Sequence, residues 1–205
     1  MSDYLSRART SYDAVAEDYA EFVRPRFASD AVGRGMLGAF AELVTGSVAD
    51  VGCGPGHVTA HLAGLGVDAF GVDLSPRMVA VARRQYPDLR FEVGSMTALQ
   101  AADGALGGIV AWWSIFHVPP DVLPAVFAEF TRTLAPGGHV VMGFHAGDEH
   151  LRPERAYGHP VTYDAYLLPP DHVADLLRRA GFAVSARVEL AGAKRPQAIL
   201  LARKR

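Results

Sequence analysis

The sequence has only one cysteine, Cys53, among its 205 residues. A lone cysteine excludes a disulfide within the chain and is typical of proteins in a reducing compartment, so we expect a cytoplasmic location. Because Cys53 stands in a glycine-rich stretch, we interpret its side chain as a small filler and not as a nucleophile.

Long hydrophobic runs and an excess of positive charge are also absent. The longest apolar run, at about residues 109–118, is too short to span a bilayer, and Ser114 and His117 interrupt it. The first residues are not a basic segment followed by an apolar one, so we expect no signal peptide. The formal net charge is −2, and the basic residues 194–195 and 203–205 are expected to be solvated. We therefore expect neither a membrane nor a nucleic-acid partner.

Length and composition fit one globular domain, with 50% hydrophobic and 20% charged residues. Strand-like apolar stretches alternate with segments of helical periodicity, which favours a parallel sheet with helices on both faces. Pro25 is expected to end the first helix, and Ser75 and Asp171 are expected to cap later ones. The expected strands are 48–52, 67–73, 89–93, 108–113, 139–144, 184–190 and 197–202, and the expected helices begin near residues 12, 30, 57, 76, 123 and 171.

A glycine-rich loop follows the first expected strand. Residues 50–58 have the sequence D-V-G-C-G-P-G-H-V. Glycines between a strand and a helix let backbone N–H groups approach a ligand closely. The second expected strand ends in Asp73, roughly 20 residues after the loop, where a carboxylate can hold a ribose diol. The two features together predict a cofactor that contains a nucleoside.

The loop also discriminates among such cofactors. A dinucleotide site requires G-x-G-x-x-G/A, but His57 occupies the third position here, and no G-x-x-x-x-G-K-[ST] phosphate loop occurs. The remaining pattern is Asp50 followed by G-x-G-x-G. An acidic residue at the loop entrance repels a polyphosphate, but it suits a ligand with an ammonium and a sulfonium group.

The pattern resembles motif I of the class I S-adenosylmethionine-dependent methyltransferases. Four further segments are similar to motifs of that family: Y-D-x-x-A-x-x-Y at 12–19, the fourth strand within 99–118, L-A-P-G-G at 134–138 and A-G-F at 180–182. The resemblance implies an α/β, Rossmann-like, doubly wound fold with a seven-stranded, mostly parallel sheet. The last strand is expected to be antiparallel, because only a short turn separates it from the strand before it.

The resemblance also implies one methyltransferase domain over 1–205, with 1–28 as an N-terminal lid helix and 146–170 as an acceptor-side insert. Within it, Asp73 is expected to bind the ribose, Leu74, Ser95 and Met96 the adenine, and Asp50 the amino-acid half through its field or a water. Ser95 stands where many members have an aspartate. The cofactor-binding residues that we predict are Tyr12, Tyr19, Asp50, Gly52, Cys53, Gly54, Gly56, Asp73, Leu74, Ser95, Met96 and Trp113.

Two histidines are candidate catalytic residues. His117 and His145 follow the fourth and fifth expected strands, at the edge of the sheet where ligands bind. Either is suited to act as a base for a phenol or carboxylate acceptor, whereas an amine acceptor needs little more than positioning. His150 and His159 lack the spacing of a metal site, so we predict no metal.

We therefore predict transfer of a methyl group from S-adenosylmethionine to a small-molecule acceptor, by O- or N-methylation, with S-adenosylhomocysteine as the product. A monomer and a homodimer are both compatible with the sequence. One alternative is a non-catalytic module that binds S-adenosylmethionine or S-adenosylhomocysteine. A NAD-dependent oxidoreductase is a second alternative, which His57 disfavours.

Overall fold

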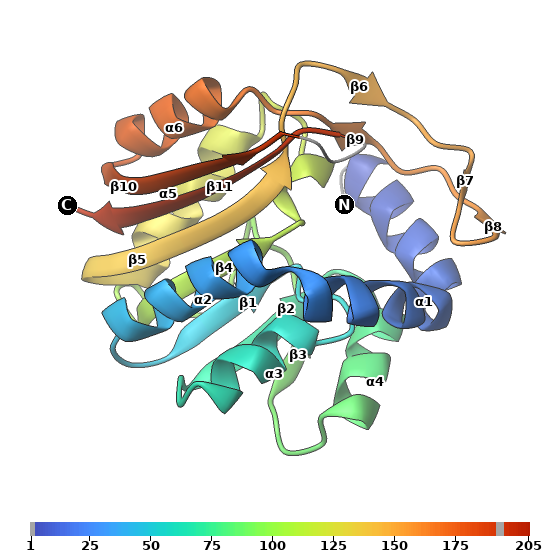
Figure 1. The fold of residues 1–205 in the computed structure, drawn as a ribbon, viewed down its shortest axis with the longest axis horizontal. Coiled ribbons are helices and arrows are strands. Elements are labelled where there is room, and N and C mark those ends of the chain that lie inside the picture. The colour runs from blue at the N-terminus through green and yellow to red at the C-terminus, as the bar shows by residue number, and fades with distance from the viewer. Residues whose placement is uncertain (1–2, 192–194) are drawn as a thin grey trace.

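A seven-stranded sheet is the centre of the computed structural model, which describes residues 3–191 and 195–205 (Figure 1). Met1, Ser2 and Lys194, which belong to the predicted lid segment and to a predicted solvated basic stretch, lie outside the described residues. The strand order is β10-β11-β5-β4-β1-β2-β3. The strands are β1 (Val48–Val51), β2 (Ala69–Asp73), β3 (Phe91–Val93), β4 (Leu106–Trp112), β5 (Leu134–His145), β10 (Phe182–Leu190) and β11 (Gln197–Lys204).

The direction of the strands confirms the predicted fold class. β1 pairs parallel with β2 and β4, and β4 pairs parallel with β5. β11, the last strand, is antiparallel to both of its neighbours, β5 and β10. The carboxyl ends of β1, β2, β4 and β5 consequently meet at one edge of the sheet, and ligands of doubly wound sheets bind at this edge.

Helices cover both faces because side chains along each strand alternate between them. Val110 of β4 packs with α2 (Ala31–Leu43) and α3 (His57–Gly64), whereas its neighbour Ile109 packs with α5 (Leu123–Thr133) and α6 (Pro170–Arg179). In Figure 1, α2 lies in front of the sheet and α5 behind it. The fifth of these helices, α4 (Pro76–Gln85), contacts β2 and β3.

The predicted cap at Ser75 is confirmed, two other predictions are wrong, and Asp30 caps α2, which was not predicted. The side chains of Ser75 and Asp30 accept hydrogen bonds from the backbone N–H groups of Met78 and Gly33, at 3.0 and 2.8 Å. Asp171 does not cap α6, because Pro169 is the N-cap and Asp171 pairs with Arg187. Pro25 does not end the first helix, since α1 runs over Asp3–Ser29 with this proline inside it.

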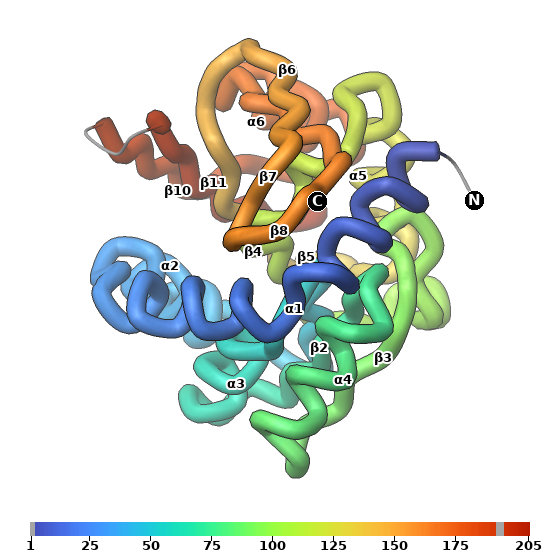
Figure 2. The backbone as a smooth tube through the Cα atoms, turned by 90° about the vertical axis from the view of Figure 1, so that its right-hand side faces the viewer, coloured from blue at the N-terminus to red at the C-terminus, as the bar shows by residue number. Residues whose placement is uncertain are grey.

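The carboxyl-end edge of the sheet is covered by α1 and by the segment between β5 and α6, which lie side by side in both views (Figures 1 and 2). We call residues 146–169 the insert. It contains two small antiparallel pairs and the bridge of Ala146 to Leu168. The pairs are β6 (His150–Leu151) with β9 (Ala165–Tyr166), and β7 (Arg155–Ala156) with β8 (His159–Pro160).

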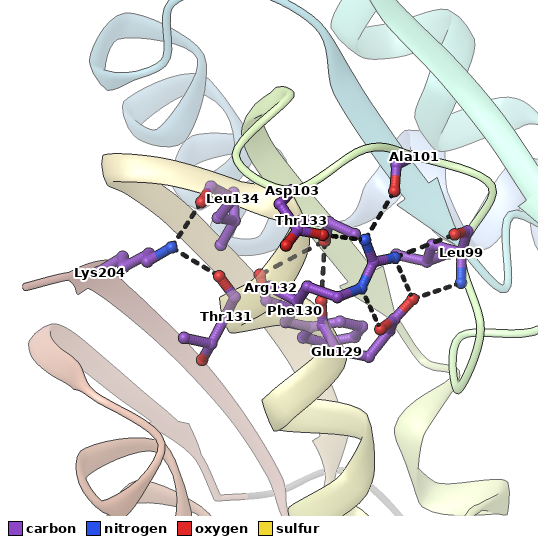
Figure 3. Close-up of polar contacts among 10 residues, drawn as sticks. All are labelled: Leu99, Ala101, Asp103, Glu129, Phe130, Thr131, Arg132, Thr133, Leu134 and Lys204. Atoms are coloured by element: carbon purple, nitrogen blue, oxygen red, sulfur yellow. Dashed lines mark hydrogen bonds and ion pairs between the residues drawn. The ribbon is translucent and has the colours of Figure 1, made fainter.

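Polar contacts fix the connection between β3 and β4 to α5 (Figure 3). Arg132 donates to the carbonyl of Ala101 at 2.9 Å and pairs with Asp103 at 2.6 Å. Glu129 accepts from the backbone N–H of Leu99 at 2.7 Å and pairs with Arg132. These bonds secure the chain that leads out of β3 without contributing to the cavities described below.

None of the helices within 3–191 and 195–205 is both long and apolar enough to cross a membrane.

Candidate functional site

The glycine loop leaves the carboxyl end of β1 with a backbone that only glycine adopts easily. Gly52 and Gly54 have φ angles of +74° and +53°. A Cβ on Gly52 would lie 2.3 Å from the Cβ of Ser114, which is too close for any side chain. A Cβ on Gly54 would instead extend toward the ring of Tyr19, at 3.5 Å. The loop therefore presents bare backbone to the space beneath α1.

Asp73 lies beside this loop at the end of β2. One carboxylate oxygen accepts from the backbone N–H of Gly54 and the other from that of Ser75, both at 2.8 Å. Burial raises the pKa of Asp73 to about 6 in spite of these bonds. The two hydrogen bonds fix the plane of the carboxylate, and each oxygen keeps a lone pair that can accept from a ligand.

A first cavity of about 770 Å³ opens over Asp73. Its walls include the predicted adenine residues Leu74, Ser95 and Met96. The Ser95 hydroxyl lies 2.8 Å from the Thr97 hydroxyl and shares a hydrogen bond with it. Of the groups predicted to contact the adenine, this hydroxyl therefore already has a hydrogen-bond partner within the protein. The other predicted residues that line this cavity are Tyr12, Tyr19, Gly52, Gly54, Asp73, Trp113 and His117.

A second carboxylate, that of Asp50, is fully buried in β1. One of its oxygens accepts from the hydroxyl of Thr59 at 2.7 Å, and the other has no partner among the described residues. Burial raises the pKa of Asp50 to about 7. An unpaired buried oxygen is costly, and Asp50 is one of the residues that line a cavity.

Two further predicted loop residues are Cys53, which lines the second cavity described below, and Gly56. Burial raises the pKa of the Cys53 thiol well above its usual range, so the thiol is not an activated nucleophile. Gly56 was predicted to bind the cofactor, but it lines neither large cavity. A Cβ at Gly56 would meet the ring of Phe91 at 2.7 Å, which means that close packing beside the start of α3 requires this glycine.

Tyr12 and His117 form a hydrogen-bonded pair between α1 and the turn after β4. The hydroxyl of Tyr12 lies 2.7 Å from Nε2 of His117, and Nδ1 of His117 lies 2.9 Å from the carbonyl oxygen of Asp164. A carbonyl can only accept, so Nδ1 carries the proton and Nε2 accepts from Tyr12. Burial lowers the pKa of His117 to about 4 and raises that of Tyr12. Both groups are therefore neutral at pH 7.

The second cavity, of about 1270 Å³, continues from the first past Tyr12, Tyr19 and Trp113. It contains the second catalytic candidate, His145, whose buried Nδ1 has no partner among the described residues. Burial lowers the pKa of His145. Of the two candidate histidines, His117 thus has both nitrogens in hydrogen bonds, whereas Nδ1 of His145 makes none to another described residue.

The structure also identifies cavity residues that the sequence analysis missed. Phe22 and Arg26 line the second cavity on the same side of α1 as Tyr19, at spacings of three and four residues that place them on one helix face. Tyr157 reaches this cavity from the insert, and Gln197 lies opposite His145 in the β5–β11 pairing. Helical periodicity could have found the first two residues, but the last two depend on tertiary contacts.

Ion pairs and hydrogen bonds join α1 to the insert above both cavities. The carboxylate of Asp164 is 3% exposed and receives hydrogen bonds from Arg7, His150 and Arg152. Burial opposes ionisation of this carboxyl, but these three partners outweigh it and lower the pKa of Asp164. The backbone N–H of Thr162 donates to the hydroxyl of Ser11 in α1 at 2.9 Å.

The fold and the site together are typical of one class of protein. A doubly wound sheet with a glycine loop, a carboxylate at the end of the second strand and a cavity over both is typical of proteins that bind a nucleoside-containing cofactor. Residues 48–138 match the family model described as "Methyltransferase domain". This match agrees with the class I S-adenosylmethionine-dependent methyltransferase family that the sequence motifs resemble.

Similar proteins carry the same description. The chain is 36% identical over 109 residues to a demethylmenaquinone methyltransferase of Beutenbergia cavernae, covering 53% of this chain and 45% of that protein. It is 36% identical over 130 residues to a trans-aconitate 2-methyltransferase of Methylobacterium nodulans, covering 60% and 46%. The chain thus spans about half the length of these relatives. A solved complex, DhpI with S-adenosylhomocysteine, shares the fold with a TM-score of 0.79 and 21% identity over 98% of this chain and 97% of that one.

Proposed function

We propose that this protein is a methyltransferase that transfers the methyl group of S-adenosylmethionine to a small molecule. The observation that carries the proposal is the Asp73 carboxylate, which the N–H groups of Gly54 and Ser75 orient toward a cavity of about 770 Å³. A carboxylate with two fixed oxygens suits the vicinal hydroxyls of a ribose, because each oxygen accepts one hydrogen bond.

The residues around Asp73 fit the rest of the cofactor. Leu74 and Met96 offer apolar surface to the adenine, and Gly52 and Gly54 leave room for the chain that leads to sulfur. The unpaired oxygen of Asp50 suits the ammonium group. Arg26, which lines the second cavity, suits the carboxylate of the cofactor.

When bound, S-adenosylmethionine supplies an electrophilic methyl carbon, and its sulfur keeps the electron pair of the broken bond. The protein contributes orientation and exclusion of water, which can lower a barrier by on the order of 7–11 kcal/mol at best. His145 is the better placed base, because it lines the second cavity and its Nδ1 makes no hydrogen bond to another described residue. His117 positions the Tyr12 hydroxyl, which donates to it.

In this proposal α1 acts as the lid predicted for residues 1–28, and the insert acts as the acceptor-side segment predicted for residues 146–170. The support is that α1 supplies Tyr12, Tyr19 and Phe22 to the cavities, while the insert supplies Tyr157. The contact of Asp164 with Arg7 joins the two covers. A small-molecule acceptor agrees with the names of the two relatives, which give demethylmenaquinone and trans-aconitate as the methylated compounds.

Titration calorimetry with S-adenosylhomocysteine tests the cofactor assignment. We expect one binding site per chain and an affinity about 30-fold weaker in Asp73→Asn, which corresponds to about 2 kcal/mol for hydrogen bonds to a charged group. The matched control is Asp68→Asn, an exposed carboxylate just before the same strand that accepts from Ser47. Equal affinity in the two variants contradicts the ribose assignment, and binding of NADH instead contradicts the proposed family function.

The alternative of a non-catalytic module needs a separate assay. We expect slow conversion of S-adenosylmethionine to S-adenosylhomocysteine in the presence of a broad panel of phenols, amines and carboxylic acids. Binding of the cofactor without turnover of any compound in the panel favours the non-catalytic alternative.

A further inference from the structure

The second cavity has aromatic walls from three separate parts of the chain. Phe22 and Phe27 come from α1, Trp112, Trp113 and Phe116 from the end of β4 and the turn after it, and Tyr157 from the insert. The residues proposed to hold the amino-acid tail of the cofactor are a minority of the lining of this cavity: Arg26, Asp50, Gly52 and Gly54. The proposed function therefore leaves most of this cavity without an assigned ligand.

Trp113 is held in the wall by an unusual backbone. Its φ angle is +53°, a conformation that is unfavourable for a bulky residue. The backbone N–H of Trp113 donates to the carbonyl of Gly143 at 2.9 Å, which helps to maintain this conformation. As a result the residue lines both cavities, where a ligand can stack on it.

His145 is a polar feature among these aromatic rings. Its ring centre lies 5.2 Å from that of Trp113 and 5.1 Å from that of Phe116. Its Nδ1 is buried and has no hydrogen-bond partner within the described part of the chain. The imidazole is thus a polar group in the cavity wall whose Nδ1 makes no hydrogen bond to another described residue.

The charged side chains that line the cavity are already engaged or assigned. Asp30 accepts from the backbone N–H of Gly33, and Asp50 is assigned to the cofactor ammonium. The guanidinium of Arg26 lies 3.4 Å from the ring centre of Phe22 and is assigned to the cofactor carboxylate. A highly charged acceptor would lose its hydration here without gaining a counter-charge.

We propose that the methyl acceptor is a flat, uncharged aromatic or heteroaromatic compound that stacks on Trp113 and donates a hydrogen bond from a ring O–H or N–H to the imidazole of His145. This inference rests on the proposed methyltransferase function. His145 is the residue that selects for the donor group, and Trp113 selects for the flat ring.

The chain contains only two tryptophans, and both line this cavity, so their fluorescence reports its occupancy. With S-adenosylhomocysteine bound, three probes are titrated: 2-naphthol, 2-methoxynaphthalene and trans-aconitate. The quenching is corrected for absorbance, and binding is checked by ligand-observed NMR. We expect 2-naphthol to bind about tenfold more tightly than its methyl ether, which lacks the donor, and we expect no quenching by trans-aconitate.

Variants of His145 test its contact. His145→Phe keeps a ring of similar size but removes the nitrogen, so it is expected to bind 2-naphthol as weakly as the ether. His145→Asn keeps an acceptor near the position of Nδ1 and is expected to retain the preference. His172→Phe is the control, because this histidine is exposed on α6. Equal binding of naphthol and ether by the wild type, or tighter binding of trans-aconitate, overturns the inference.

The outcome separates this inference from the proposed function. If S-adenosylhomocysteine binds but 2-naphthol does not, the acceptor assignment is wrong and the methyltransferase proposal stands. If S-adenosylhomocysteine itself does not bind, the methyltransferase proposal fails, and the acceptor assignment fails with it.

Discussion

Asp50→Asn is expected to stabilise the ligand-free protein while it weakens cofactor binding. Burial raises the pKa of Asp50 from 3.8 to about 7, so the folded protein binds this proton more tightly than the unfolded chain does. Stability therefore falls as the pH rises from about 4 to 7, and the full loss is present above pH 7. Asparagine carries no charge at any of these pH values and avoids the loss.

The size of the effect follows from the shift in the pKa of Asp50. Three pKa units correspond to about 4 kcal/mol at pH 8, and about 2 kcal/mol of this is already present at pH 5, where the unfolded carboxyl is ionised. The advantage of the variant over the wild type is thus expected to grow by about 2–3 kcal/mol from pH 5 to pH 8. The hydroxyl of Thr59 can still donate to the amide oxygen, so this bond is kept.

Urea unfolding at pH 5 and pH 8 measures this difference directly, and calorimetry with S-adenosylmethionine gives the second half of the prediction. We expect the variant to bind the cofactor about tenfold more weakly, on the scale of one hydrogen bond to a charged group. A variant with the same stability advantage at both pH values, or with unchanged cofactor affinity, refutes this reasoning about Asp50.

Three further predictions follow from the same contacts. His117 is expected to be neutral at pH 6 with its proton on Nδ1, because burial lowers its pKa to about 4; a charged ring in long-range ¹H–¹⁵N NMR spectra contradicts this. Gly52→Ala is expected to lower the free energy of unfolding by about 3 kcal/mol in urea titrations, owing to the positive φ of Gly52 and the contact with Ser114. A loss below about 0.5 kcal/mol refutes the assignment of strain. Asp164→Asn is expected to speed hydrogen exchange in α1 and the insert, whereas Asp175→Asn, which breaks the exposed pair with Arg178, leaves both unchanged.

Local sequence patterns were sufficient to predict the fold and the cofactor side of the candidate site. Glycines at 52 and 54 and a carboxylate at 73 are brought together by strands that are adjacent in the sheet, so their spacing in the sequence carried the information. The Ser75 cap was equally local. Pro25 was misinterpreted, because α1 continues past it to Ser29, and Phe27 beyond the proline packs against His57 and His61 of α3.

The acceptor side depends on contacts between distant residues. Tyr12 and His117 are 105 residues apart, and Arg7 and Asp164 are 157 apart, so no local pattern indicates either pair. The sequence offered His117 and His145 as equivalent bases. Only the structure, by engaging both nitrogens of His117 and leaving Nδ1 of His145 without a hydrogen bond to another described residue, distinguishes between them.

A crystal structure of the protein with S-adenosylhomocysteine is the most direct test of the central claim. We expect both ribose hydroxyls within hydrogen-bond distance of the Asp73 carboxylate, the adenine beside Met96, and the amino-acid tail over Gly52 and Gly54 toward Asp50. A ligand bound elsewhere on the chain, or a ribose that does not contact Asp73, contradicts the account.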